Sequence, residues 1–368
     1  KSDKFCGLKG FGTCDIAIPA LTGATYQVEQ NLETAETMST FAGTNGTVTM
    51  KMWTPYGSPL VMVELATDKP VEVSLKLNHL EGEGQTRSVG RTDGVSWIAS
   101  GYTAEQAEIP VMVTCAMAVR GVNADTFQLR PGKPVTVVLS LRSTFDSPQR
   151  AAEEARRVAR TANLAAALAK HRTFWREFWA KSFVEIGDPV IERQCDLSYY
   201  ILACCTGNRE FPPGIWGPWL LTSKAGWWGS YHYNYNYEAA FYHLYSGNRI
   251  AQTECYDAPP LAAMEKCRDY AQKYLKCRGV YFPVSTGPKG QHWNVNLGQW
   301  AFFGQKSNAA YILANVAMRW GMTRDLAYAR KVYPLVLGVV DFWEDYLKLR
   351  NKELSNEQGE RTKHLKGK

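Results

Sequence analysis

The pattern of apolar and polar residues changes its period once along the 368-residue chain, near residue 147. Before that point apolar residues alternate with polar ones, as in TVTMKMW from Thr47 and VEVSLKL from Val71. Alternation places every second side chain on one face of a strand, so the pattern predicts an antiparallel β-sandwich. The clearest strands are expected at Thr47–Trp53, Val61–Leu65, Val71–Leu77, Met112–Val119 and Pro134–Leu141.

Asn45 and Gly46 precede the first of these strands and allow two interpretations. Asn-Gly is a strong hairpin signal, because both residues readily adopt positive φ. The same asparagine opens the glycosylation sequence Asn-Gly-Thr. We favour the hairpin.

After residue 147 the apolar residues recur with the helical period. Ser147-Pro148 and Asp188-Pro189 each combine an N-cap residue with proline at the first helical position. The first pair predicts one long helix through AAEEARRVARTANLAAALAKHRTFWREFW, and the second a helix over VIERQCDLSYYILACC. Further helices are predicted over Glu238–Tyr245, Pro260–Cys277, Ser307–Trp320 and Arg324–Lys348, the last interrupted at Pro334.

These patterns predict a mixed fold, β first and then α. An N-terminal antiparallel β-sandwich is followed by helical hairpins. We divide the chain into a β-sandwich domain (1–146), a helical linker (147–187), a helical domain (188–348) and a basic polar tail (349–368).

Composition and charge exclude several classes of partner. A hydrophobic content of 45% with 21% charged residues is that of a globular protein. No apolar run approaches the ~20 residues of a membrane helix, so no membrane partner is expected. Of the net charge of +7, the segment Leu347–Lys368 carries +4, from seven Lys or Arg and three Glu. Only Lys224 lies near the Trp/Tyr-rich segment, and no nucleic-acid partner is expected.

The nine cysteines lack both the C-x-x-C spacing and the Cys and His spacing of metal ligands, so neither a metal site nor a cofactor is predicted. No glycine-rich phosphate loop with a lysine occurs either. Cys6 and Cys14 flank a glycine-rich loop and could pair in an exported protein. We expect a bacterial protein in an extracytoplasmic location, periplasmic or secreted.

The stretch WWGSYHYNYNYE, Trp227–Glu238, concentrates aromatic and amide side chains. If its second half is extended, Asn234 and Asn236 point to one side and the neighbouring tyrosines to the other, with Tyr235 packed inward. Uncharged amides beside flat aromatic faces suit the binding of sugar hydroxyls and sugar C–H faces. The alternative is a buried aromatic core with hydrogen-bonded asparagines.

Three motifs, taken together, resemble a known family. WWGSYHYNYNYEAAFYHLYSGN is similar to the "YHxNxNxxMNYW" signature of the α-L-fucosidases of glycoside hydrolase family 95. GNREFPPGIWGPWL precedes it, in the place of that family's "RPGxLPxxLQGIWN". KVYPLVLGVVDFWEDYLK follows it and resembles "YPxxKGAAEFFLDWL". Their order and spacing agree with the family.

The resemblance implies a β-sandwich, a helical linker and an α/α toroid of six helical hairpins. It also implies an inverting glycosidase that acts on an oligosaccharide or glycan, with Asn234 and Asn236 as catalytic residues that hold the attacking water. The aromatic and polar residues around this motif are predicted to bind substrate: Trp216, Trp227, Trp228, His232, Glu238, His292 and Gln305.

The chain departs from the family after Leu349. The "PSxSPEN"-like loop that carries the general acid in the family is replaced by RNKELSNEQGERTKHLKGK, so neither Glu353 nor Glu357 is expected to act as the acid. We therefore expect the front half of such an enzyme, a partial toroid that is weakly active or inactive. Self-association, or a partner that covers the open helical face, is expected. The alternative is a non-catalytic carbohydrate-binding or scaffold protein.

Overall fold

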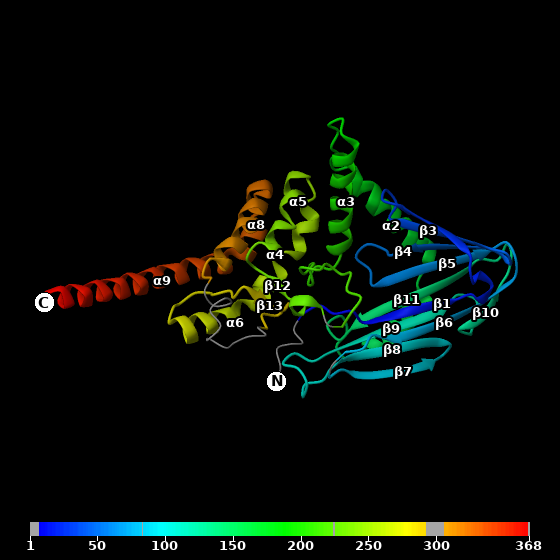
Figure 1. The fold of residues 1–368 in the computed structure, drawn as a ribbon, viewed down its shortest axis with the longest axis horizontal. Helices are drawn as coiled ribbons and strands as arrows, with labels where there is room; N and C mark the ends of the chain where they lie inside the picture. Colours follow the sequence, from blue (N-terminus) through cyan, green and yellow to red (C-terminus); the bar gives the residue numbers. More distant parts are fainter. Residues whose placement is uncertain (1–6, 83, 224, 292–304, 367–368) are drawn as a thin grey trace. The chain divides into compact units, whose positions relative to one another are not determined.

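The computed structural model describes residues 7–82, 84–223, 225–291 and 305–366, and Figure 1 follows the chain through its elements. The side chains of Trp228, 353–354 and 357–366 lie outside this description. Strands occupy the chain from Gly12 to Ser143, and helices dominate from Ala151 to Lys366. The predicted order, antiparallel β-structure followed by helices, is confirmed.

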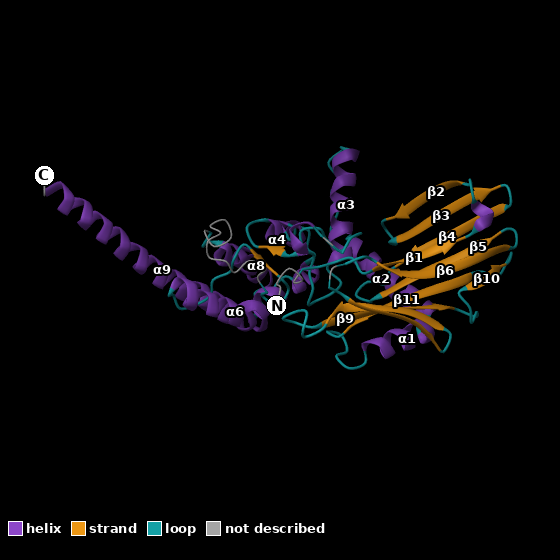
Figure 2. Cartoon of the chain, turned by 60° about the horizontal axis from the view of Figure 1, so that its bottom comes forward, coloured by secondary structure: helices purple, strands orange, loops and turns teal. Residues whose placement is uncertain are grey.

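The N-terminal strands form two antiparallel sheets, seen in Figure 2. The larger has the order β2-β3-β4-β5-β11-β9-β8-β7, and the smaller has the order β1-β6-β10. The strands are β1 (Gly12–Ala17), β2 (Thr25–Asn31), β3 (Glu36–Gly43), β4 (Gly46–Trp53), β5 (Leu60–Thr67), β6 (Val71–His79), β7 (Thr86–Thr92), β8 (Val95–Tyr102), β9 (Val111–Val119), β10 (Thr126–Leu129) and β11 (Val135–Ser143). A short 3-10 helix, η2 (Pro19–Leu21), follows β1.

The hairpin predicted before Thr47 is present. Gly43 and Gly46 are paired across β3 and β4, so Thr44 and Asn45 form a two-residue loop. Gly46 has φ +132°, which a residue with a side chain rarely adopts. The turn therefore lies one residue earlier than the Asn-Gly pair indicates.

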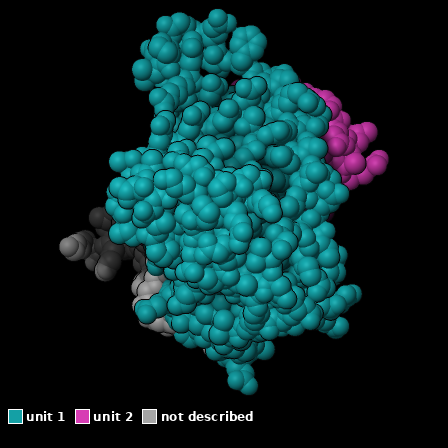
Figure 3. All heavy atoms as spheres, turned by 90° about the vertical axis from the view of Figure 1, so that its right-hand side faces the viewer, with its two compact units in different colours: residues 1–2, 9–208, 219–226 teal, residues 3–8, 209–218, 227–368 magenta. Residues whose placement is uncertain are grey.

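The chain divides into two units, coloured in Figure 3. Among the described residues, the first unit contains 9–208 and 219–226, and the second contains 7–8, 209–218 and 227–366. The main boundary thus falls between Asn208 and Arg209. The helical linker predicted over 147–187 lies in the same unit as the sheets, and the predicted four-part division stays a prediction.

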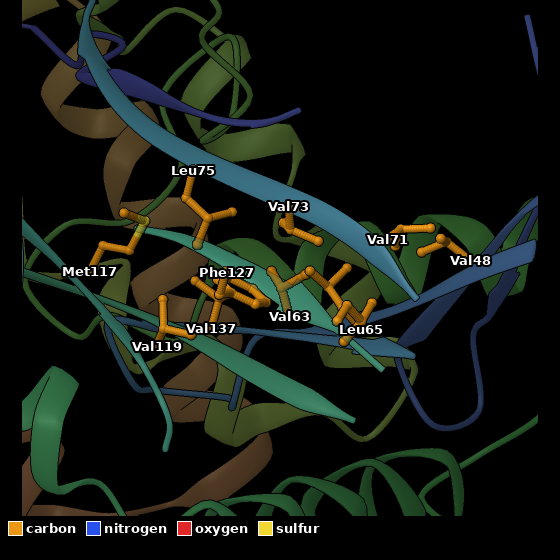
Figure 4. Close-up of a cluster of buried hydrophobic side chains, with 11 residues drawn as sticks. Val48, Val63, Leu65, Val71, Val73, Leu75, Met117, Val119, Phe127 and Val137 are labelled. Carbon is orange, nitrogen blue, oxygen red and sulfur yellow. The ribbon is translucent and has the colours of Figure 1, made fainter. Parts of the chain in front are cut away.

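The core of the first unit lies between the two sheets. Along β6, Val71, Val73 and Leu75 are buried while Glu72 and Lys76 are exposed, as the alternating pattern requires. Figure 4 shows how their side chains meet those of the larger sheet. The buried cluster consists of Val48, Val63, Leu65, Val71, Val73, Leu75, Met117, Val119, Phe127, Leu129 and Val137.

The other face of the larger sheet is covered by α1 (Ala151–Thr161) and α2 (Leu164–Trp179). Ala155 and Ala159 of α1 are fully buried against β8 and β9, where the small side chains allow a close approach (Figure 2). The prediction of one continuous helix through this segment is wrong. Asn163 breaks it, because its side chain accepts a hydrogen bond from Ala166 N–H at 3.0 Å and begins a new helix.

Of the helix starts predicted at Ser147 and Asp188, one is confirmed and the other is wrong. Asp188 accepts hydrogen bonds from the N–H groups of Val190 and Ile191, and α3 (Pro189–Cys205) begins at the proline as predicted. The start predicted at Ser147 is wrong, since α1 begins at Ala151.

Helices make up most of the second unit. Its long helices are α6 (Ala258–Leu275), α8 (Asn308–Thr323) and α9 (Leu326–Lys366), and α9 packs against both others. Its short elements are η3 (Gly226–Gly229), which begins one residue before the unit, β12 (Tyr231–His232), α4 (Asn236–Ala239), α5 (Tyr242–Ser246), η4 (Ile250–Cys255) and β13 (Ser285–Thr286). The helix predicted over Glu238–Tyr245 is thus two short helices.

The segment from 349 to 366 is the last part of α9, which Figure 1 shows running to the C-terminal end. The sequence predicted a helix that ends at Lys348 and is interrupted at Pro334, with a polar tail beyond it. Both statements are wrong: Pro334 lies inside the helix, and the helix continues to Lys366. Lys, Glu, Arg, Gln and Leu have high helix propensity, so a polar segment that begins on an existing helix extends it readily.

Candidate functional site

A two-stranded ladder supports the segment that carries the paired asparagines. In β12, Tyr231 and His232 pair with Thr286 and Ser285 of β13. Tyr233 extends the ladder by donating its N–H to the carbonyl of Val284 at 2.8 Å. The segment before the asparagines is therefore extended, and its last residue, Tyr233, is the first of the run predicted to be extended.

The extended run ends earlier than predicted, at Tyr235. This residue has φ +123° and ψ −47°, which turns the chain, and α4 begins at Asn236. The prediction that the chain stays extended to Tyr237 is therefore wrong. A regular strand cannot continue through a positive φ.

We call the three residues at this turn, 234–236, the asparagine turn. All three side chains are exposed. Asn234, Tyr235 and Asn236 are all exposed, whereas Tyr233 and Tyr237 are buried. The inward packing predicted for Tyr235 is wrong, because its side chain is 60% exposed. Its positive φ moves the side chain off the buried face that the flanking tyrosines share. Both amides are nevertheless accessible to a ligand, and their catalytic role and the cleft predicted around them stay predictions.

An aromatic cluster lies just before this turn. The rings of Trp216 and Trp227 are 6.4 Å apart, and those of Trp227 and His232 are 5.0 Å apart. The two indoles are 47% and 58% exposed, while His232 is 7% exposed. We call these three residues the aromatic platform. Three of the predicted substrate-binding residues are thus brought together beside an accessible surface.

His232 is held on the buried side of the platform. Its Nδ1 lies 3.3 Å from the carbonyl oxygen of Ser230, and the Ser230 hydroxyl is 2.6 Å from that of Ser285. Burial lowers the pKa of His232 from its ordinary value, only partly offset by the Ser230 carbonyl. The ring is therefore neutral at pH 7.

Glu238 is fully buried, and its side chain contacts the main chain of the turn. Its Oε2 accepts a hydrogen bond from Tyr235 N–H at 3.0 Å, and its main-chain carbonyl accepts one from Asn315 Nδ2 at 3.2 Å. Its Oε1 has no hydrogen-bond partner among the described residues. Burial raises the pKa of the carboxyl to about 7. The substrate-binding role predicted for Glu238 stays a prediction, and in the structure its side chain binds the main chain.

The raised pKa of Glu238 implies that the stability of the protein depends on pH. Tyr233, Tyr242 and Tyr256 are the titratable groups that interact electrostatically with Glu238, and burial raises their own pKa values, so they are neutral near pH 7. Because the folded pKa of Glu238 exceeds the unfolded one, the folded state holds the proton more tightly. The free energy of unfolding therefore falls as pH rises from about 4.5 to about 7.

Glu238→Gln removes this titration. Relative to the variant, the wild type is expected to lose roughly 2 kcal/mol between pH 5 and pH 8. Urea unfolding of both proteins at the two pH values measures the difference, in which other titrating groups cancel. A difference that does not change with pH would contradict the assignment.

The loop over 209–218 carries Trp216 of the aromatic platform and contacts other segments of the same unit. Tyr231 OH donates to the Pro212 carbonyl at 3.0 Å, and Lys289 Nζ lies 3.4 Å from Glu210 Oε2. The first motif of the sequence analysis is thus linked to the second by contacts within one unit.

The third motif, on α9, contacts the segment that leads into the same ladder. Val280 N–H donates to the Gly338 carbonyl at 2.9 Å, and the rings of Tyr281 and Phe342 are 5.8 Å apart. The segment that continues from these residues forms β13, which pairs with β12. The helix therefore fixes the loop on which the asparagine turn rests.

Gln305, His292 and Trp228 complete the residues that were predicted to bind substrate. Gln305 is exposed, and its carbonyl accepts a hydrogen bond from Tyr281 OH at 3.2 Å. His292 and the side chain of Trp228 lie outside the described residues. Their predicted roles stay predictions.

A family model, glycosyl hydrolase family 95 catalytic domain, matches residues 176–361, just over half of the chain. The chain belongs to glycosyl hydrolase family 95. The matched range contains the aromatic platform, the asparagine turn and most of α9, so the family resemblance seen in the three motifs is confirmed.

Two solved structures show weaker similarity. A bacterial glucoamylase complexed with acarbose has 8% identity and a TM-score of 0.48, and the match covers 91% of this chain and 53% of that one. A family 92 α-mannosidase from Bacteroides thetaiotaomicron has 10% identity and a TM-score of 0.37, with 85% and 42% covered. The chain thus spans about half the length of these structures. No curated protein matches it.

Asn315 of this family 95 chain is not among the site residues predicted from the sequence. Asn308 and Asn315 lie seven residues apart on α8, and both are buried. Asn308 Nδ2 donates to the Phe282 carbonyl at 3.1 Å, while Asn315 binds Glu238. A polar residue that recurs on the apolar face of a helix was the available signal, because a buried amide requires a hydrogen-bond partner.

The described residues of this family 95 chain contain neither a metal-binding cluster nor a membrane-spanning helix. No three His, Cys, Asp or Glu side chains gather in a way that could hold a metal ion. No helix within these residues is both long and apolar enough to span a membrane.

Proposed function

We propose that the chain is part of an inverting glycosidase of the α-L-fucosidase type. The observation that carries the proposal is the exposure of both Asn234 and Asn236 two to four residues after His232 of the aromatic platform. Family membership supplies the reaction class, the cleavage of a glycosidic bond. The fucose specificity rests on the similarity of the asparagine motif to that of the fucosidases.

The turn and the platform have complementary chemistry. Each amide offers two donors and an acceptor without charge, which suits sugar hydroxyls and a water molecule. The exposed indoles of Trp216 and Trp227 offer flat apolar faces to the C–H groups of a sugar ring. An amide can orient a water molecule for attack, but its removal of a proton requires a carboxylate.

We assign no general acid among the residues whose side chains the structure describes. Glu238 is buried and bound to Tyr235 N–H, which leaves it poorly placed to reach a glycosidic oxygen. The residues from 349 to 366 are helical, whereas the resemblance implies an acid on a loop. We therefore propose that the chain by itself is weakly active or inactive.

The burial of Glu238 also favours a second candidate function. A non-catalytic carbohydrate-binding or scaffold protein needs the platform and the amides, but no acid. Hydrolysis by a longer form of the protein would support the first candidate over this one.

Binding of fucosylated lactose tests what both candidates share. The sugar is expected to quench tryptophan fluorescence, since Trp216 and Trp227 are exposed beside the turn. Asn234→Ala should weaken binding about tenfold, the effect of losing roughly one hydrogen bond. Fluorescence titration of the wild type and the variant measures the two dissociation constants.

Asn351→Ala is the matched control, because Asn351 is an exposed asparagine on α9. It should bind as the wild type does, and lactose without fucose should bind more weakly to all three proteins. Equal affinity of Asn234→Ala and the control, or no quenching in any protein, would count against a sugar site at the turn.

The remaining features of the proposal concern partners and location. An oligosaccharide or glycan is the proposed ligand, and an extracytoplasmic bacterial location is proposed with it. Self-association or a covering partner is also proposed, supported by apolar side chains exposed along α9: Leu326, Tyr333, Leu337, Val340 and Leu347.

A further inference from the structure

Tyr235 has a main-chain conformation that its own side chain disfavours. A residue with a Cβ at φ +123° lies outside the allowed regions, and such conformations persist only where the surroundings impose them. An N-cap residue normally has an extended conformation with negative φ. The N-cap of α4 therefore requires a specific restraint.

The Glu238 carboxylate provides that restraint. Its Oε2 accepts the Tyr235 N–H at 3.0 Å, and the Tyr235 carbonyl accepts the N–H of Ala239 at 2.9 Å. The main chain of Tyr235 is thus held at both ends by residues of α4. A glutamate three residues after the N-cap is half of a capping box, used here on an unfavourable N-cap conformation.

Glu238 is in turn held by a different helix. Asn315 on α8 donates to the Glu238 carbonyl at 3.2 Å, and both residues are fully buried. Asn315 thus fixes the main chain of the residue whose carboxylate accepts from Tyr235 N–H. A fully buried residue therefore makes the side-chain contact with the main chain of an exposed turn.

We propose that Glu238 is a positioning residue, whose carboxylate holds Tyr235 in the strained turn that exposes Asn234 and Asn236 together. The consequence for ligand binding rests on the proposed function, whereas the consequence for the turn does not. Without the acceptor, Tyr235 relaxes to negative φ, and Asn234 and Asn236 lose the exposure that this turn gives them. Glu238 thus acts through the main chain and touches no sugar.

Hydrogen exchange at the Tyr235 amide tests the turn without any sugar. Glu238→Gln retains an acceptor oxygen, and Glu238→Leu has a similar volume but none. The amide should be protected in the wild type and in Glu238→Gln, and should exchange at least about tenfold faster in Glu238→Leu, as expected when a hydrogen bond is lost. If the leucine variant does not fold, the wild type alone decides, since an unprotected Tyr235 amide overturns the proposal.

A double-mutant cycle then tests the route through Tyr235. Glycine adopts positive φ without strain, so Tyr235→Gly makes the restraint unnecessary. Glu238→Leu should weaken binding of fucosylated lactose about tenfold in the wild type, and less than about twofold in the Tyr235→Gly background. Glu238→Gln should bind within about twofold of the wild type.

The outcomes separate this proposal from the proposed function. Absence of sugar binding in every protein would end the proposed function, and the exchange rates would still decide the role of Glu238. Equal exchange in Glu238→Leu and the wild type would overturn the positioning role. So would an equal loss of affinity in both backgrounds, because Glu238 would then act without Tyr235.

Discussion

Fucosylated lactose incubated with this chain is expected to release fucose at least about 10²-fold more slowly than with an ordinary glycosidase. General acid catalysis contributes roughly 10² to 10⁴-fold, and we assign no acid among the residues whose side chains the structure describes. The only carboxylate in contact with the asparagine turn, among the described residues, is that of Glu238, which is buried. Chromatography of released fucose measures the rate.

The leaving group distinguishes a missing acid from a defective site. An alcohol leaving group needs a proton, whereas a fluoride or a dinitrophenolate needs little assistance. The deficit should therefore be much smaller with fucosyl fluoride than with fucosylated lactose, and Asn234→Ala should reduce the residual rate on the fluoride. Turnover of fucosylated lactose at ordinary rates would show that the chain contains its acid, and Glu238→Gln would then be the first variant to measure.

Gly279→Ala is expected to lower the free energy of unfolding by about 3 kcal/mol or more. Gly279 has φ +74°, and a Cβ there would lie 2.1 Å from the Gly338 carbonyl oxygen and 2.4 Å from Phe342 N. Both are main-chain atoms of α9, so neither can move aside without shifting the helix. Strain of the positive φ and overpacking each contribute about 1 to 3 kcal/mol.

Gly321→Ala is the control for this substitution. Gly321 lies in α8 and has open space where a Cβ would be, so alanine there should leave stability unchanged or raise it by up to about 1 kcal/mol. Urea unfolding of both variants gives the comparison. Similar stability of the two variants would mean that the contact between α9 and the segment before β13 is looser than described.

Much of the fold could be predicted from local patterns, because the periodicity of apolar side chains and the capping residues lie within each element. The alternation in β6 gave its buried face, and Asp188 with Pro189 gave the start of α3. Helix ends were less reliable. Asn163 ends one helix and begins the next within an alanine-rich segment, whereas the helix α9 continues through Pro334. Whether a residue interrupts a helix depends on what the main chain around it contacts.

The candidate site was likewise predicted in part from the sequence. The sequence predicted that Asn234 and Asn236 are accessible, and both are exposed, although the extended run from which this was inferred ends at Tyr235. Trp216, Trp227 and His232 were among the residues predicted to bind substrate, and the structure brings them together. The conformation of Tyr235 could not be predicted in this way. Its positive φ is maintained by Glu238, and Glu238 is held by Asn315, which is 77 residues away in the sequence.

The sequence by itself determined the order of β-structure and helices, the family and the residues of the asparagine motif. These follow from side-chain periodicity and from the identity of neighbouring residues, which need no knowledge of distant contacts. Only the tertiary structure decided that the chain turns at Tyr235 and that α9 continues to Lys366. It also decided that Glu238 faces the main chain, because a buried carboxylate must find its hydrogen-bond donor wherever the packing of helices leaves one.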